Sequence, residues 1–338
     1  MTGVGRCMGL AGPFVLLASV ACSPGEAPGE PVELTIPAGA SFVAVTDTLV
    51  ARDLVRFPAI FRLFARLRGD DREIRAGGYR VAPGTRWVPL LDQLVAGRVI
   101  TRPLTIPEGF TLDQIAGRLA EWTGTTPDEV AIRLSDEALA ERWNVPGPGL
   151  EGYLFPDTYR FAPGVSLNAI LRAMVDRYHS IWTGPWRARA DSLGLSEREV
   201  TTLASIVQAE AMHEEEMPTI SGVYHNRLRI GYLLQADPTV QYALGARRSR
   251  LLYADIDSVA DHPYNTYTQP GLPPGPIGAP GEAALTAALY PADVDYLYFV
   301  ARPDGTHIFT RDLGDHNQAR VQARREWDAV ERSPGGGS

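Results

Sequence analysis

The sequence predicts an α+β protein, with a small strand-and-helix module followed by a larger domain of helices and one β-hairpin. Three observations lead to this fold class: strand–turn–helix patterns in the first hundred residues, capped apolar helices in the middle, and a hairpin signature near the end. The 338 residues, 45% hydrophobic and 21% charged, are enough for two or three domains with ordinary cores. No internal repeat is visible in the sequence.

The N-terminal segment predicts that the chain is exported. Arg6 precedes an apolar run over residues 8–21, which is shorter than the roughly 20 residues of a membrane-spanning helix and has the length of a signal-peptide core. The run ends in SVAC, which resembles a lipobox with Cys22 as the lipidated residue; a cleaved signal peptide and a short uncleaved anchor are the alternatives. We therefore expect residues 1–22 to attach the chain to the cytoplasmic membrane. Residues 23–31 would then link this anchor to domains in the cell envelope, outside the cytoplasm on the periplasmic side.

Composition excludes several kinds of chemistry. The net charge of −8 disfavours nucleic-acid binding. All 32 basic residues are arginine, so the chain has no lysine for a Schiff base or a phosphate-binding P-loop. The two cysteines, Cys7 and Cys22, lie in the N-terminal segment, so the exported part has neither disulfides nor thiol chemistry. The six histidines are scattered without the spacing of metal ligands, and we expect no metal site.

Residues 32–103 predict the small α+β module. A strand, a glycine turn and a helix occupy residues 32–55, a second helix occupies residues 57–69, and a strand, a Pro-Gly turn and a helix occupy residues 74–97. Nothing in this module suggests catalysis, so a spacer is the simple alternative for it.

Residues 104–332 predict the larger domain, and residues 333–338 a flexible tail. Thr111 is a candidate N-cap for a helix, and a helical, charged stretch follows to about Asn144. Glycine, proline and aromatic residues then break the periodicity over residues 147–164, which indicates either packing corners or a binding loop.

The remaining elements follow from caps and turns. A capping box formed by Ser196 and Glu199 starts a helix that runs to an acidic cluster, and a second helix begins at about Pro218. A long Pro/Gly loop then enters a helix, a hairpin turns about residues 303–305, and a closing helix is capped by Asp315.

One glutamate stands apart in the acidic cluster LASIVQAEAMHEEEMP. At about 100° per residue, Glu210 lies in the middle of the apolar stripe of the preceding helix. Burial would raise the pKa of such a carboxyl and keep it protonated near neutral pH, as a general acid requires. An ion pair with Arg227 or Arg229 is the structural alternative. The glutamates at positions 214–216 lie beyond the stripe, and we expect them to face water as a solvated helix end.

Several longer segments carry a resemblance to a known family. They are LASIVQAEA, VYHNRLRIGYLLQADPTVQYALG, YNTYTQPGLPPGPIGAPGEAALTAALYP, YLYFVARPDGTHIFTRDLGDHN and LEGYLFPDTYRF. These segments strongly resemble the endolytic murein transglycosylases, also called the MltG or YceG-like family, and the last one matches the family's LEG-x-L-FPDTY segment. AGGYRVAPGTRWVPLLDQLVAG is similar to part of the family's LysM-like module. The resemblance covers residues 32–326 in the family's order.

The resemblance implies cleavage of the MurNAc–GlcNAc β-1,4 bond inside peptidoglycan glycan strands, without water, to leave a 1,6-anhydro-MurNAc end. The family's catalytic glutamate ends its ASIV-x-x-E motif, which assigns that role to Glu210. Many members carry a further glutamate two positions earlier, where this chain has Gln208. Glu210 would protonate the glycosidic oxygen and then accept the proton of the 6-hydroxyl as the anhydro ring closes, while the N-acetyl group or local dipoles stabilise the cation. No cofactor is implied.

The resemblance also implies contacts with the sugar chain, for which amides, hydroxyls and aromatic rings are suitable. Each of these residues could instead serve the fold, and for Arg227 the alternative is to hold Glu210 in place. The expected substrate-binding residues are Glu151, Tyr153, Asp157, Asn226, Arg227, Gln235, Asp237, Thr239, Tyr264, Asn265, Thr266 and Tyr267.

Two rival functions stay open from the sequence. A hydrolytic muramidase would add water and need a second carboxylate opposite Glu210, for which Glu151 or Asp157 could serve. A non-catalytic peptidoglycan-binding envelope protein would act through the LysM-like module. Aminodeoxychorismate lyase, a label that chains of this family have carried, needs a cofactor-bearing lysine and is excluded. The expected partners are peptidoglycan glycan strands and, by the resemblance, the penicillin-binding proteins that synthesise them.

Overall fold

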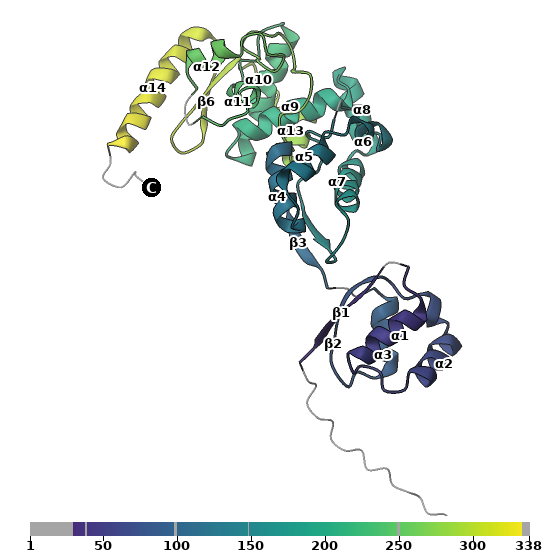
Figure 1. Ribbon diagram of the computed structural model, residues 1–338. Helices are drawn as coiled ribbons and strands as arrows, with labels where there is room; N and C mark the ends of the chain where they lie inside the picture. Colours follow the sequence, from purple (N-terminus) through teal and green to yellow (C-terminus); the bar gives the residue numbers. More distant parts are fainter. Residues whose placement is uncertain (1–29, 38, 98–99, 148, 249–250, 333–338) are drawn as a thin grey trace, which may run out of the picture. The chain divides into compact units, whose positions relative to one another are not determined.

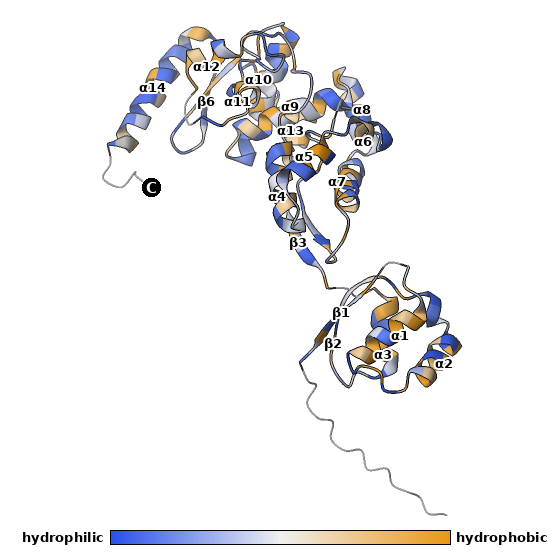
Figure 2. Cartoon of the chain, in the orientation of Figure 1, coloured by the Kyte–Doolittle hydropathy of each residue, from blue (hydrophilic) through white to orange (hydrophobic). Residues whose placement is uncertain are grey.

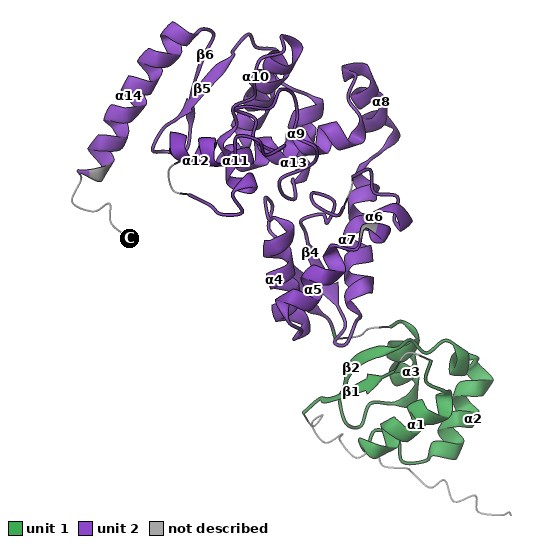
Figure 3. Ribbon diagram, turned by 45° about the horizontal axis from the view of Figure 1, so that its top comes forward, with its two compact units in different colours: residues 1–100 green, residues 101–338 purple. Residues whose placement is uncertain are grey.

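The computed structural model describes residues 30–37, 39–97, 100–147, 149–248 and 251–332. The chain divides into two compact units, residues 1–100 and residues 101–338 (Figure 3). Within the described ranges the protein is mostly helical and has three antiparallel two-stranded sheets, which confirms a mixed α+β fold (Figure 1). Cys22, the predicted anchor and the C-terminal tail lie outside the described residues. No helix in the described ranges is both long and apolar enough to cross a membrane.

The smaller unit has the predicted order of strand, two helices, strand and helix. Ser41 caps the first helix by accepting a hydrogen bond from the amide of Ala44 at 3.2 Å. Phe61 and Tyr79 are fully buried in a core between the helices and the sheet, and α1 and α3 are mostly orange in Figure 2. The elements are β1 Val32–Ile36, α1 Phe42–Ala51, α2 Pro58–Arg68, a 3-10 turn Asp70–Arg72, β2 Gly77–Val81 and α3 Trp87–Val95, with β1 paired to β2.

The first half of the larger unit confirms the cap at Thr111, whose side chain forms a capping box with Gln114. The charged stretch that follows is divided into separate short helices. The segment predicted as a loop over residues 147–164 contains a strand, which pairs with a strand more than 50 residues earlier. The elements are β3 Arg102–Thr105, α4 Leu112–Thr123, α5 Pro127–Leu134, α6 Glu137–Arg142, β4 Thr158–Phe161, α7 Leu167–Ile181 and α8 Gly184–Leu193.

The second half is built around α9, which is buried from Val200 to Val207 and packs against α10, α11 and α13. Its predicted capping box is confirmed, because Ser196 and Glu199 exchange hydrogen bonds at 3.3 and 2.8 Å. The elements are α9 Glu197–Glu210, a 3-10 turn Glu214–Glu216, α10 Met217–Arg229, α11 Asp237–Ala243, α12 Tyr253–Ser258, α13 Glu282–Leu289, β5 Tyr298–Ala301, β6 His307–Thr310 and α14 Leu313–Glu331.

The predicted hairpin and closing helix are present, but the predicted cap of that helix is wrong. The helix begins at Leu313, and its N-cap is Asp312, whose side chain accepts the amide of Asp315 at 2.9 Å. Asp315 therefore lies inside the first turn, where its amide is the donor that the cap satisfies. Its carboxylate still lies near the positive end of the helix dipole.

Candidate active site

Glu210 is the last residue of α9, and its half-buried side chain is held by one hydrogen bond from a neighbouring helix. The hydroxyl of Tyr224, on α10, donates to Oε1 of Glu210 at 2.8 Å. Tyr224 is itself 1% exposed and lies edge-on to Phe299 at 5.8 Å between ring centroids. Because the tyrosine ring is buried and packed against Phe299, its hydroxyl is held in place. Oε1 is thus occupied, and Oε2 is left to carry an acidic proton.

The surroundings of Glu210 shift its pKa toward neutrality. Burial, the largest cause, together with the negative charge of Asp237, raises the pKa of Glu210 to about 7, against the lowering effects of the Tyr224 hydrogen bond and the Arg227 charge. Both the protonated and the ionised form are then populated near neutral pH. A carboxyl in this state can donate a proton in one step and accept one in the next.

The alternative expected from the sequence, an ion pair of Glu210 with Arg227 or Arg229, is not found among the described residues. The guanidinium of Arg227 donates to the carbonyl oxygens of Leu297, at 2.7 Å, and Leu234, and it stacks on Tyr232 and Tyr298. Arg229 donates to the side chain of Asn226 at 2.8 Å. Arg227 therefore influences Glu210 through its charge while its hydrogen bonds hold the backbone around the site.

A second carboxylate acts on Glu210 from α11. Asp237 is the exposed first residue of that helix and accepts a hydrogen bond from the hydroxyl of Tyr267. Two residues earlier, Gln235 has a backbone φ of 48°, in the left-handed region that residues other than glycine rarely adopt. Its amide donates to the carbonyl of Thr266 at 3.0 Å, which binds the entry of α11 to the loop that carries Tyr267. Strain of this kind persists where the surrounding structure holds it, and it often marks a functional site.

Six of the residues predicted to touch sugar are buried and serve the fold. Thr239 and Thr266 share a hydroxyl hydrogen bond at 2.8 Å, while the amide of Asn265 donates to the carbonyls of Ile256 and Val259. Their side chains make contacts within the fold, and the sugar contacts expected for these six residues stay predictions. The six are Tyr153, Asn226, Arg227, Thr239, Asn265 and Thr266.

Glu151 is a further carboxyl with a pKa near neutrality. Burial raises its pKa to about 7, against hydrogen bonds from the amide of Leu112 and the hydroxyl of Tyr242, each at 3.2 Å. Tyr264 packs on Tyr242 at 4.8 Å between ring centroids. Glu151 thus binds the start of α4 to α11. The other predicted acid of that segment, Asp157, is exposed and pairs with Arg177 at 2.9 Å.

The rest of the acidic cluster does not behave uniformly. Glu214 and Glu215 are exposed, as predicted. The prediction for Glu216 is wrong, because its carboxylate accepts the amide of His307 at 3.0 Å and contacts Nδ1 of the same residue at 2.8 Å. Glu216 therefore links the end of the acidic cluster to β6. Gln208 accepts the amide of Gly281 at 2.9 Å and so links α9 to α13.

Sequence reasoning missed Tyr224 as a residue of the site. Its signal is a tyrosine on the buried face of an amphipathic helix, where the hydroxyl needs a polar partner. No group of three or more histidine, cysteine, aspartate or glutamate side chains among the described residues could hold a metal ion.

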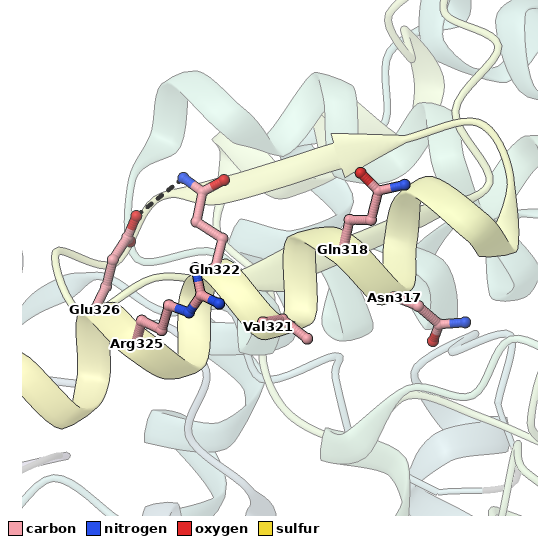
Figure 4. Close-up of a pocket in the computed structure, with 6 residues that line it drawn as sticks. All are labelled: Asn317, Gln318, Val321, Gln322, Arg325 and Glu326. Carbon is pink, nitrogen blue, oxygen red and sulfur yellow. Dashed lines mark hydrogen bonds between the residues drawn. The ribbon is translucent and has the colours of Figure 1, made fainter.

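A surface depression on α14 is lined by none of the residues described above (Figure 4). It is bordered by side chains of that one helix, so it has no opposing wall to position a substrate. Its one carboxylate, Glu326, is already bound by Gln322 at 3.0 Å and Arg302 at 2.9 Å. We therefore place no chemistry there.

Comparisons with known proteins agree with the resemblance seen in the sequence. The family described as the YceG-like family matches residues 34–322. An endolytic murein transglycosylase of Bacillus subtilis (strain 168) is 33% identical over 306 residues, which cover 86% of this chain and 84% of that protein. One from Streptococcus pneumoniae serotype 2 is 29% identical and covers 85% of this chain and 57% of that protein. The crystal structure of a YceG-like protein from Listeria monocytogenes matches with a TM-score of 0.59 and 32% identity, over 86% of this chain and 99% of that one.

Proposed function

The chain belongs to the YceG-like family, and on that premise we propose that it is an endolytic murein transglycosylase. It would cleave the MurNAc–GlcNAc β-1,4 bond within peptidoglycan glycan strands and leave 1,6-anhydro-MurNAc ends. The observation that carries this proposal is Glu210, a half-buried carboxyl oriented by Tyr224, with a pKa raised to about 7. Its position ends the segment that resembles the family's catalytic motif.

One carboxyl completes the proposed reaction. In the first step Glu210 donates its proton to the glycosidic oxygen, the C1–O bond breaks, and positive charge develops on the MurNAc ring. In the second step the ionised Glu210 accepts the proton of the MurNAc 6-hydroxyl as that oxygen bonds to C1. The proton returns to Glu210, no water is consumed, and the enzyme ends in its starting state. A pKa near neutrality suits both steps, because neither protonation state is strongly disfavoured.

Hydrolysis of the same bond by a muramidase reaction is the rival function. It requires a second carboxylate to activate water or to attack the sugar. The carboxylate whose charge acts on Glu210 is Asp237, and neither Glu151 nor Asp157, the two acids predicted from sequence, has that effect on it. The product separates the two reactions, since a hydrolysed end is heavier than an anhydro end by one water.

We test the proposed function by digesting purified sacculi with the wild-type chain and with Glu210→Gln, followed by mass spectrometry of the products. The wild type should release fragments with anhydro ends, and the variant should release almost none. Glu215→Gln, which changes an exposed glutamate of the same cluster, should match the wild type. Equal yields of anhydro ends from wild type and Glu210→Gln would overturn the proposal.

We further propose that the smaller unit is a LysM-like module and that the N-terminal segment attaches the chain to the cytoplasmic membrane. The strand–helix–helix–strand order of the unit supports the first part, and the apolar run ending at Cys22 supports the second. The catalytic unit would then act on glycan strands near the membrane, within reach of peptidoglycan synthases. The attachment is tested by fractionating cells that express the wild-type chain or Cys22→Ser. If a lipid on Cys22 attaches the chain, the variant should leave the membrane fraction while the wild type stays in it.

A further inference from the structure

The carboxylate of Asp237 has features that a merely surface-exposed charge would not need. It opens α11, which packs against α9, the helix that ends at Glu210. The hydroxyl of Tyr267 donates to Oδ1 of Asp237 and fixes the direction of its side chain. Tyr267 in turn follows Asn265 and Thr266, whose buried side chains anchor the loop to α12 and α11. The chain thus supports one exposed carboxylate at the start of a helix that packs against the Glu210 helix.

We propose that Asp237, clamped by Tyr267, is a positioning residue whose negative charge keeps Glu210 protonated until the glycosidic bond breaks. This inference rests on the proposed function of Glu210 and extends it to a second carboxylate. Asp237 does not touch the reacting atoms in this role. It acts through Glu210, because a neighbouring negative charge disfavours a second ionisation.

The groups that act on Glu210 come from both helices packed against the end of α9. From α10, the Tyr224 hydroxyl and the Arg227 charge favour the ionised form of Glu210, and from α11 the Asp237 charge opposes it. Tyr267, from the loop after α12, shares the same neighbourhood: burial raises its pKa most, and the charges of Asp237 and Glu210 raise it further. The Arg227 cation and the Tyr224 hydroxyl thus lower the pKa of Glu210, and the Asp237 anion raises it. Removing the Asp237 charge should therefore lower the pKa of Glu210.

The same charge serves the second half of the reaction. Once Glu210 has given up its proton, the negative charge of Asp237 disfavours the ionised form of Glu210 and so favours return of a proton to it. That return is the step in which the 6-hydroxyl is deprotonated. The negative charges also favour the positive charge that develops on the sugar ring. Asp237 therefore assists both steps and forms no bond to the sugar.

The test is the pH profile of kcat/KM on sacculi for the full chain and its variants. Activity that needs a protonated Glu210 declines on the basic side of the profile, and Asp237→Asn should move that decline to lower pH. We expect a loss of about threefold or more at pH 8 with a smaller loss at pH 5.5. Asp237→Glu, which keeps the negative charge, should show the same decline of kcat/KM at basic pH as the wild type. Asp257→Asn, which removes a charge from an exposed position on α12, should leave the profile unchanged.

Tyr267→Phe provides a second route to the same result. It removes the hydroxyl that holds Asp237 and leaves the charge, so the basic limb should move in the same direction by a smaller amount. Profiles of Asp237→Asn and Tyr267→Phe that both superimpose on the wild type would overturn the inference. Failure of the proposed function is a separate outcome, recognised by full activity of Glu210→Gln.

Discussion

Glu210→Gln should make the protein more stable at alkaline pH while it abolishes cleavage. The folded-state pKa of Glu210 is raised from 4.5 to about 7, so the folded chain binds a proton more tightly than the unfolded chain does. The resulting stability is fully present below about pH 4.5 and is lost as the pH rises through about 7. Glutamine keeps the acceptor oxygen for the Tyr224 hydroxyl and carries no charge at any pH, so the variant escapes this loss.

The size of the effect follows from the pKa change. A rise from 4.5 to about 7 corresponds to at most about 3 kcal/mol of unfolding free energy lost on ionisation. Because the Glu210 side chain is partly exposed, solvent screens some of this, and we expect a gain of about 1–3 kcal/mol for the variant at pH 8. At pH 4.5 the gain should be much smaller, since both side chains are then largely uncharged.

Urea denaturation of both chains at pH 4.5 and pH 8 measures this difference directly. The midpoint of Glu210→Gln should lie above that of the wild type at pH 8 and approach it at pH 4.5, with equal slopes. Glu215→Gln, at an exposed position, should show no such dependence on pH. A midpoint difference that is the same at both pH values would refute the reasoning, because it would show that Glu210 ionises as easily in the folded chain as in the unfolded one.

Two other substitutions test the contacts around the site. Tyr224→Phe removes the hydrogen bond that lowers the pKa of Glu210, so the basic limb of kcat/KM should move to higher pH, and loss of orientation should reduce kcat about tenfold; an unmoved limb would contradict this. Gly152→Ala should destabilise the fold by about 2–4 kcal/mol, because the new Cβ would lie 2.4 Å from Pro276 at a φ of 82°. Gly164→Ala, at a φ of 79° with open space around it, should cost only about 1 kcal/mol, and equal melting temperatures for the two variants would disprove the steric account.

Features with a local cause were predictable from the sequence. The capping box at Ser196 and Glu199 satisfies helix amides within one turn, and the hairpin about residues 303–305 is set by its turn residues, so both appear as short motifs. Glu210 was distinguishable from its neighbours because helical periodicity placed it on the apolar stripe.

Features that depend on distant partners were not predictable. Strands β3 and β4 have four residues each, too few for a visible alternation, and they pair only because the fold brings them together. The side-chain amide of Asn226 donates to the carbonyls of Val294 and Tyr296, about 70 residues later, and no local pattern in the sequence indicates these two hydrogen bonds. The contact between Tyr224 and Glu210 likewise depends on how α10 packs against α9.

The central claim is that Glu210 serves as both acid and base in a reaction that uses no water. Digestion of sacculi by the wild-type chain in oxygen-18-labelled water tests this most directly, with mass spectrometry of the new MurNAc ends. We predict ends that are lighter than a hydrolysed end by one water and that contain no labelled oxygen. Labelled oxygen at the new reducing ends would contradict the account and identify the enzyme as a hydrolase.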